Sequence, residues 1–288
     1  MHRAVREYLE TLDDEAFGAA SPVEPKFTSH SDPASQWTGA RGGPAYFAYS
    51  ANYLIDTDHA VILDVEASRS IRQAEVGAVR TMVDRVDDRF DLTPERLIAD
   101  TAYGSGPMLD WLVNERGIAP HIPVIDKSGR KDGTYERADF AYDSTKDAYI
   151  CPGGKELKQY RRAFTTPRAG ANKDGTLRYR ARKADCEACG LKPKCCPNES
   201  QRKVTRSIYE PARDVARAIS QTLQYAISCK LRKKVEMLFA HLKRILGLRR
   251  LRLRGPCGAR DEFHLAATAQ NLRKLAKLIP APQTIRPV

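Results

Sequence analysis

An aspartate that follows a short apolar run is the first residue whose setting suits metal chemistry. Asp100 comes after Leu97-Ile98-Ala99, which predicts a buried strand, and before a loop that contains Gly104. In open α/β sheets, ligands bind outside the carboxyl ends of the strands. A carboxylate there can bind Mg²⁺, which prefers oxygen ligands. The alternative is that Asp100 is an N-cap or turn aspartate.

Glu236 is the second candidate, because it is the one acidic residue among the many basic residues of 230–244. At about 100° per residue, Arg232, Glu236 and Lys243 fall within about 40° of one another on a helix, along the edge of an apolar stripe. Nearby positive charge should keep Glu236 ionised, as a metal ligand requires, while Lys243 could contact a phosphate. The alternative is a solvated Arg232–Glu236 ion pair, worth only a few tenths of a kcal/mol. The stripe consists of Val235, Leu238, Phe239, Leu242, Ile245 and Leu246.

Five of the seven cysteines lie between residues 151 and 196 and predict a zinc site. A Cys-x2-Cys turn places two thiolates on one side of a zinc ion, which takes four ligands in a tetrahedral arrangement. We expect structural Zn²⁺, holding together a loop-rich insertion that lacks a hydrophobic core. The alternative is a set of reduced, buried thiols. The expected ligands are Cys151, Cys186, Cys189 and Cys195, with Cys196 interchangeable with Cys195.

The charge of +12 is unevenly distributed along the 288 residues. Residues 1–150 carry 16 basic and 26 acidic side chains, whereas residues 151–288 carry 32 basic and 10 acidic ones. A half with a net charge of +22 suits a polyanion, and nucleic acid is the first candidate. No apolar run has the roughly 20 residues of a membrane span, and the N-terminus lacks the apolar core of a signal peptide. We therefore expect a soluble, cytoplasmic protein with no membrane partner.

Hydrophobic periodicity predicts the elements that must position these residues. Two β-prone runs, 45–55 and 60–66, flank a short polar turn and predict an antiparallel hairpin. Apolar residues recur at helical spacing over 5–17, 71–90, 105–116, 211–243 and 261–278. Short strands are predicted at 96–99, 121–125 and 178–182. This order predicts an α/β fold with a mixed sheet.

The composition divides the predicted fold into five parts. A helix and linker occupy 1–40, and the first part of the α/β core occupies 41–125. Periodicity fades over 126–210, which we interpret as a basic, cysteine-rich insertion. The C-terminal helical part of the core is 211–279, and 280–288 is a tail. Basic residues of the insertion could contact phosphates without reading sequence: Lys155, Lys158, Arg161, Arg162, Arg178, Arg180, Arg182 and Lys183.

The motif Arg232-x3-Glu236-x6-Lys243, with Asp100 at a strand end in Ala-Asp-Thr-Ala-Tyr-Gly, resembles the core of the DDE transposases of bacterial insertion sequences. The run 249–255 and the late Ala-Gln-Asn-Leu at 269–272 also resemble the end of that family's domain. The resemblance extends from about residue 31 to 278. The family has a tyrosine three residues before the arginine, where this sequence has Cys229, and Tyr225 is not at the family spacing.

The resemblance implies a ribonuclease-H-like fold, with helices flanking a mixed sheet and a Cys-rich insertion before the last catalytic helix. It implies a DNA substrate, cut and joined with Mg²⁺ or Mn²⁺, and Asp100 and Glu236 as the second and third catalytic carboxylates. A homodimer in a synaptic complex fits the same family. The implied contacts with DNA phosphate are Arg232, Lys243, Arg249, Arg250, Arg252 and Arg254.

The first catalytic aspartate has no match in this sequence. Asp32 precedes Pro33, which restricts its backbone and removes a ladder hydrogen bond, and in relatives such a segment lies outside the strand. We therefore expect an N-terminally truncated transposase that lacks its first strand and is inactive alone. The alternatives are a non-catalytic nucleic-acid-binding remnant and a ribonuclease-H-like nuclease.

Overall fold

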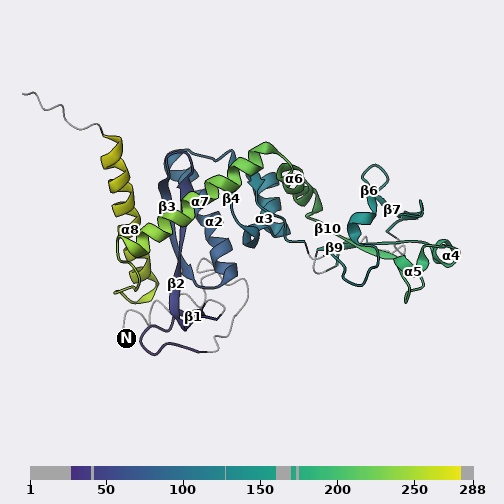
Figure 1. Cartoon of the computed structure of the whole chain (residues 1–288), viewed down its shortest axis with the longest axis horizontal. Helices are drawn as coiled ribbons and strands as arrows, with labels where there is room; N and C mark the ends of the chain where they lie inside the picture. Colours follow the sequence, from purple (N-terminus) through teal and green to yellow (C-terminus); the bar gives the residue numbers. More distant parts are fainter. Residues whose placement is uncertain (1–26, 40–41, 127, 160–169, 173–174, 280–288) are drawn as a thin grey trace, which may run out of the picture. The chain divides into compact units, whose positions relative to one another are not determined.

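A computed structural model describes residues 27–39, 42–126, 128–159, 170–172 and 175–279 (Figure 1). By its internal contacts the chain divides into two compact units: Met1–Ile98 with Leu223–Val288, and Ala99–Thr222. The architecture is mixed α/β, with helices and several small sheets. The helix predicted over 5–17 and the tail 280–288 lie outside the described residues. No helix in the described ranges is both long and apolar enough to cross a bilayer.

The first unit is built on an antiparallel sheet of order β1-β2-β3, formed by β1 (Gln36–Gly39), β2 (Ala45–Asp56) and β3 (Val61–Arg69). The predicted hairpin is confirmed as β2 and β3. Its turn begins at Asp56, whose carboxylate accepts hydrogen bonds from the backbone of Asp58 and His59. The predicted helix follows as α2 (Arg72–Phe90), and its helical spacing buries Ala74, Ala78, Val79, Met82, Val83 and Val86.

Strand β4 (Arg96–Ile98), α7 (Leu223–Arg244) and α8 (Gly255–Leu278) complete this unit. Helix α8 packs on β3, where its Phe263 joins a core that contains Ile62 and Val65. At the edge of β3, Asn271 accepts a hydrogen bond from the amide of Ile62 and donates one to its carbonyl. Helix α8 begins before the predicted residue 261, because Pro256 suits a first helical turn.

The second unit begins with a 3₁₀ turn at Thr101–Tyr103, then α3 (Gly106–Asp110), a π turn at Trp111–Glu115, and β5 (Ala119–His121). The strand predicted over 121–125 is wrong beyond His121. Pro123 has no N–H to give to a ladder, and the amide of Ile125 donates to the carbonyl of Gly104 instead.

Residues 126–210 contain a sheet of β6 (Ala141–Asp143), β7 (Ala148–Ile150) and β8 (Glu156–Leu157). Strands β9 (Thr176–Arg180) and β10 (Lys203–Ser207) pair antiparallel. The segment that connects them contains α4 (Lys183–Glu187) and α5 (Lys192–Cys195). The expectation that this segment lacks a hydrophobic core is wrong. Tyr149 packs edge-on against Tyr179, with ring centroids 5.2 Å apart, and Phe140, Leu157 and Val204 are buried in the same cluster.

The helix predicted over 211–243 is two helices, α6 (Glu210–Ser220) and α7, interrupted at Gln221 and Thr222. The hydroxyl groups near the break bond to helix carbonyls: Ser220 Oγ donates to the oxygen of Arg217, and Thr222 Oγ1 donates to that of Ile219. Ser and Thr compete with helix continuation in this way. The hydrophobic period does not reveal the interruption, because apolar residues occur on both sides of it.

Candidate functional site

Asp100 is exposed in the loop that follows β4 and belongs to the second unit. Its Oδ1 accepts a hydrogen bond of 2.7 Å from the amide of Ala102, so the residue caps the 3₁₀ turn at Thr101–Tyr103. This is the N-cap role that the sequence left open as the alternative. The cap occupies one carboxylate oxygen, and Oδ2 has no partner among the described residues. Asp100 can therefore cap the turn and still offer an oxygen to a cation.

Glu236 is exposed on α7, in the first unit. It forms no ion pair with Arg232 or any other described residue, so the solvated ion pair weighed from the sequence is absent here. Helix α7 is attached to the β2–β3 hairpin beside it: Phe239 stacks on Tyr53 at 4.8 Å, and Lys234 Nζ donates to the carbonyl of Thr57 at 2.6 Å. These contacts leave the Glu236 carboxylate in solvent, with its charge unneutralised by the described part of the chain.

The other residues of the motif are available to a ligand on α7. Lys243 is exposed, and Arg232 is half-buried. The predicted apolar stripe is buried at Leu242 but not at Ile245, whose side chain is 60% exposed near the end of the helix. The carboxylates of Asp100 and Glu236 belong to different units, so each is described in its own surroundings. Within the described ranges, no three His, Cys, Asp or Glu side chains are grouped so as to hold a metal ion.

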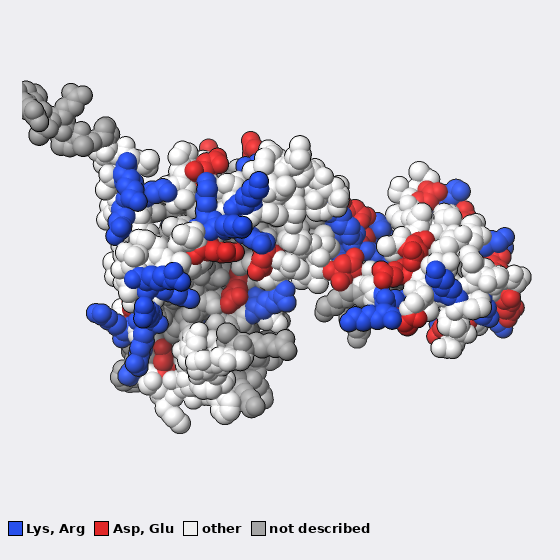
Figure 2. Space-filling view, viewed as in Figure 1, with Lys and Arg blue, Asp and Glu red and all other residues white. Residues whose placement is uncertain are grey.

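A basic surface lies on α7, α8 and the loop between them. Residues 223–279 contain 14 basic and 3 acidic side chains, and Figure 2 shows Lys and Arg gathered where these helices lie. Glu262 shapes the loop, because its Oε1 accepts hydrogen bonds from the amides of Arg252 and Leu253 at 2.6 and 2.5 Å. The loop thereby presents positive side chains to solvent. The exposed ones are Arg249, Arg250, Arg252 and Arg254.

The five cysteines of the second unit line one small hollow of about 20 Å³. Cys186, Cys195 and Cys196 are buried, and Cys151 and Cys189 are half-buried. Gly153 lies between two of the sulfurs: a Cβ on it would be 3.6 Å from Sγ of Cys189 and 3.7 Å from Sγ of Cys151. The predicted zinc ligands thus line one hollow, but no three of these described side chains are grouped closely enough to hold a metal ion.

Two of these sulfurs accept backbone hydrogen bonds. The amide of Lys155 donates to Sγ of Cys151 at 3.3 Å, and the amide of Arg202 donates to Sγ of Cys186 at 3.5 Å. Burial raises the pKa of the Cys186 thiol and raises that of Cys195 to about 11, with neighbouring Cys196 adding to both. Without a metal, these two thiols are therefore neutral near pH 7. Among the basic residues expected near them, Arg161 and Arg162 lie outside the described residues.

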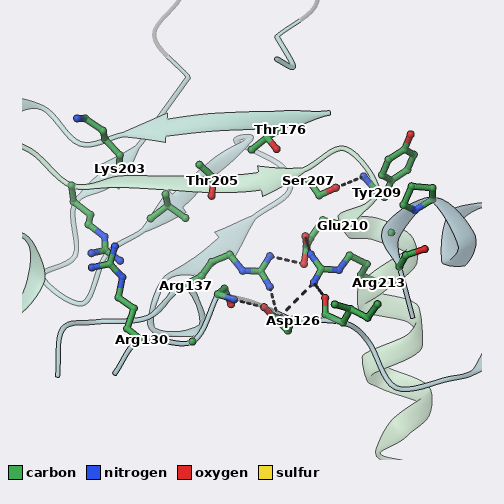
Figure 3. Close-up of a pocket in the computed structure, with 18 residues that line it drawn as sticks. Asp126, Arg130, Arg137, Thr176, Lys203, Thr205, Ser207, Tyr209, Glu210 and Arg213 are labelled. Atoms are coloured by element: carbon green, nitrogen blue, oxygen red, sulfur yellow. Dashed lines mark hydrogen bonds and ion pairs between the residues drawn. The ribbon is translucent and has the colours of Figure 1, made fainter. Parts of the chain in front are cut away.

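A larger, open hollow of about 770 Å³ lies in the second unit (Figure 3). The start of α3, the loop after β5, the β9–β10 hairpin and the start of α6 form its walls. Its lining combines hydroxyl groups with charged side chains of both signs, and Figure 3 shows Arg137 and Arg213 directed at Glu210 and Asp126. The basic side chains that line it are Arg130, Arg137, Arg202, Lys203 and Arg213.

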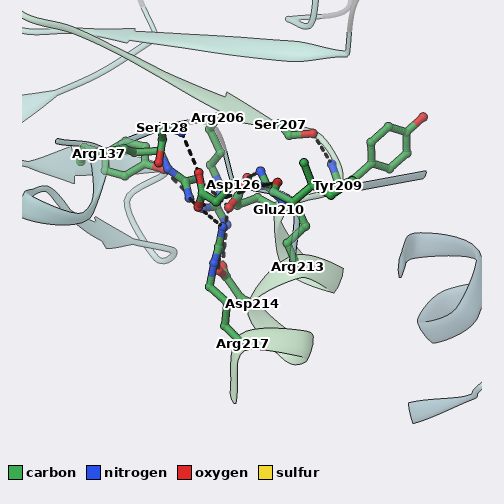
Figure 4. A network of polar contacts seen from close by, with 12 residues as sticks. Asp126, Ser128, Arg137, Arg206, Ser207, Tyr209, Glu210, Arg213, Asp214 and Arg217 are labelled. Atoms are coloured by element: carbon green, nitrogen blue, oxygen red, sulfur yellow. Dashed lines mark hydrogen bonds and ion pairs between the residues drawn. The ribbon is translucent and has the colours of Figure 1, made fainter. Parts of the chain in front are cut away.

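The charges at one side of this hollow form a network (Figure 4). Asp126 and Glu210 each form ion pairs with Arg137, Arg213 and Arg217. Burial alone would raise the pKa of both carboxyl groups. Hydrogen bonds and charges outweigh it, so the pKa of Asp126 and that of Glu210 lie below their usual values. Because its arginines are already paired, the network is a structural element rather than a free anion site.

Residues 150–276 match a family model described as "Transposase DDE domain". This match supports the resemblance of these residues to the DDE transposases. Domains of this kind generally use divalent metal ions such as Mg²⁺, and DNA is their substrate. No curated protein and no solved structure matches the chain. The matched residues contain Arg232, Glu236, Lys243 and all five clustered cysteines, whereas Asp100 precedes them.

Sequence reasoning missed two polar groups of this protein. The sequence contains only a weak indication of the network of Asp126 and Glu210: these acids lie at the two ends of the stretch 126–210, in which hydrophobic periodicity fades. For Arg202 the sequence contains no such indication. It is one of many basic residues in its half of the chain, and only the fold reveals that it is buried beside the cysteines.

Proposed function

We propose that this protein is a DDE transposase that binds DNA, and that Asp100 and Glu236 are two of the carboxylates that cut and join phosphodiester bonds in that family. The observation that carries the proposal is the state of Glu236. It lies inside the matched domain, in the Arg232-x3-Glu236-x6-Lys243 pattern, and it is exposed without a neutralising partner among the described residues. An acid left unpaired in a basic region is suited to binding a cation.

Carboxylate oxygens are the donors that Mg²⁺ and Mn²⁺ prefer. Asp100 offers the oxygen that its cap does not use, and Glu236 offers both. The bound metal would supply activation of a water or 3′-hydroxyl and stabilisation of the leaving oxygen. Arg232 and Lys243 would hold a phosphate beside Glu236, and the loop 249–254 would follow the DNA backbone through phosphate contacts.

We also propose a ribonuclease-H-like arrangement of the core. The order of elements supports it: the β2–β3 hairpin, α2, β4, α3, β5 and then the C-terminal helices. Asp100 lies two residues beyond the end of β4, close to the strand end that the resemblance implies for the second aspartate. Residues 126–210 come between β5 and the helix that holds Glu236, which is the place of an insertion before the last catalytic helix.

We propose that the chain is inactive alone because it lacks the first catalytic aspartate. The acidic side chains near the hairpin cannot readily replace it, because they already form hydrogen bonds or ion pairs within the protein. Asp32 accepts hydrogen bonds from the hydroxyl of Tyr49 at 2.6 Å and from the amide of Gly255 at 3.0 Å. Asp64 and Glu66 on β3 are buried and both form ion pairs with Arg85. A carboxylate held in this way would be costly to release to a metal.

A second metal is proposed for the cysteine-rich segment: a structural Zn²⁺ bound by Cys151, Cys186, Cys189 and Cys195, with Cys196 as the substitute for Cys195. All five thiols line one hollow, and two accept the backbone N–H bonds that stabilise thiolates. Because no group in the described ranges already has the spacing for a metal, zinc binding would have to draw the thiols closer together.

The function is tested with the full chain and DNA duplexes that carry the sequences flanking its gene. We expect salt-sensitive binding, no strand transfer with Mg²⁺ or Mn²⁺, and Mn²⁺ binding that weakens in Asp100→Ala and Glu236→Ala. Asp261→Ala is the control, since Asp261 is another exposed acid of the basic surface. Robust strand transfer by the chain alone would contradict the proposal that it is inactive alone. Unchanged Mn²⁺ binding in both variants would instead favour the rival, a non-catalytic DNA-binding protein.

A further inference from the structure

Arg202 is a buried cation to which the described residues offer no anionic partner. Its side chain is 6% exposed, just before β10. Nη1 donates to the carbonyl of Cys195 at 2.8 Å, and Nη2 donates to that of Tyr135 at 2.7 Å. The guanidinium carbon lies 4.9 Å from the centroid of the Phe140 ring. Nε is buried without a hydrogen-bond partner, and no described carboxylate forms an ion pair with Arg202.

A buried charge of this kind is strongly destabilising unless an opposite charge compensates it. Backbone carbonyls and an aromatic face satisfy part of the guanidinium but carry no net charge. The ionisable groups that share its hollow are the five cysteine thiols, two lysines and Asp185, and Asp185 forms no ion pair with Arg202. Arg202 contacts two of these cysteines: its backbone amide donates to Sγ of Cys186, and its Nη1 donates to the backbone carbonyl of Cys195.

We propose that Arg202 is the buried counter-cation of a four-thiolate zinc centre, and this inference rests on the zinc site proposed above. When one Zn²⁺ binds, four thiols release four protons to solvent, and the resulting centre carries a net charge of −2. Arg202 then reduces that buried charge to −1. Each charge stabilises the other, so the zinc ion and the guanidinium are energetically coupled.

Arg206 provides a matched control on the adjoining strand. It is also buried, at 8% exposure, and its guanidinium carbon lies 3.8 Å from the ring centroid of Tyr142. Unlike Arg202, it has a carboxylate partner, Asp214, with 3.4 Å between Nη2 and Oδ2. It does not line the cysteine hollow. A variant at Arg206 therefore removes a comparable buried guanidinium without changing the charge beside the thiols.

The test compares the full-length wild type with Arg202→Met, Arg202→Lys and Arg206→Met. Zinc affinity is measured by competition with a chromophoric chelator, and thermal midpoints are measured with bound zinc and after metal removal. We expect Arg202→Met to weaken zinc binding about 10–100-fold, the usual effect of losing a supporting group next to a metal site. Arg202→Lys keeps the charge and should retain most of the affinity. Arg206→Met should leave the affinity unchanged.

The thermal midpoints separate charge compensation from packing. In the counter-cation model, Arg202→Met lowers the midpoint of the zinc-loaded protein but leaves the metal-free midpoint unchanged or raises it, because an uncompensated buried charge is gone. A purely structural arginine would lower both midpoints alike, as expected for Arg206→Met. Equal zinc affinity in wild type and Arg202→Met would overturn the role of Arg202 alone. A wild type that binds no zinc would overturn the zinc site itself.

Discussion

Asp126 and Glu210, which stand at the two ends of the cysteine-rich segment, form ion pairs with the same three arginines. Arg213 and Arg217 project from α6, which begins at Glu210, and Arg137 comes from within the segment. Arg213 also donates to the carbonyl of Ile125, next to Asp126 in the chain. The places where the segment leaves and rejoins the rest of its unit are thus joined by one set of charges.

Glu210→Gln should destabilise the second unit. Glu210 is 0% exposed and faces three guanidinium groups, so the amide would leave buried positive charge without its partner. Breaking a buried pair in this way typically costs about 3–5 kcal/mol. Urea unfolding at pH 7 measures the change. The control is Glu199→Gln, which removes only an exposed pair with Lys203 and should leave the free energy of unfolding almost unchanged. Equal effects of the two substitutions would contradict a central role for Glu210.

The same network should give the second unit an acid limit. The folded pKa values of Asp126 and Glu210 lie below their unfolded values of about 4. Groups with a lowered folded pKa stabilise the fold above the unfolded pKa, and this contribution is lost as pH falls through the folded pKa. The free energy of unfolding should therefore change little with pH near pH 6, and it should decrease as the pH is lowered beyond about 4. The difference between wild type and Glu210→Gln should narrow over the same range, and a constant difference down to pH 3 would contradict the assignment.

Local patterns were sufficient to predict the hairpin and α2. Their side chains alternate or recur with the period of one element, and the turn residues between 56 and 60 follow ordinary turn chemistry. The break between α6 and α7 could not be predicted in this way. It depends on the Ser220 and Thr222 hydroxyl groups bonding to carbonyls, and Ser and Thr also make such bonds within continuous helices.

Local sequence patterns predict the candidate site only in part, as they do the fold. Glu236 could be singled out because one acid among many bases is visible in the sequence, but its exposure was not predicted, since it was expected at the edge of a buried stripe. The ion pairs of Asp126 with Arg213 and Arg217 join residues far apart in the chain, so no local period contains them. The core around Tyr149 and Tyr179 was missed for a similar reason: its strands are too short for alternation to be recognised.

The loop between α7 and α8 should carry part of the salt dependence of DNA binding. Replacing Arg252 and Arg254 by glutamine should reduce the slope of log K against log salt by about 1 for each phosphate that the variant no longer neutralises. The matched control replaces Arg72 and Arg89, two exposed arginines of α2, which lies outside the basic surface. Fluorescence anisotropy at several salt concentrations measures both slopes. An equal change in the control pair would show that net charge, and not this loop, sets the affinity.

Serine substitutions should identify the fourth zinc ligand. Cys195 and Cys196 are adjacent and both buried, so either sulfur could complete a set with Cys151, Cys186 and Cys189. We expect Cys195→Ser to lower the zinc content or affinity more than Cys196→Ser, measured by mass spectrometry of metal-replete protein. Cys229→Ser on α7 is the control and should leave the zinc content unchanged. The reverse order for Cys195 and Cys196 would assign the ligand to Cys196.

Two tyrosines, the half-buried Tyr53 and the buried Tyr179, should respond oppositely to loss of their hydroxyl groups. Burial raises the pKa of Tyr53 to about 12, and its buried hydroxyl has no partner among the described residues. Tyr179 donates to Asp147 and accepts a hydrogen bond from Gln159. An unpaired buried polar group costs about 1–3 kcal/mol, whereas a hydrogen bond to a charged group contributes about 1.5–3 kcal/mol. Tyr53→Phe should therefore leave stability unchanged or raise it, while Tyr179→Phe should lower it. Urea unfolding of the two variants measures both effects, and a large loss in Tyr53→Phe would mean that its hydroxyl has a bonding partner in solution.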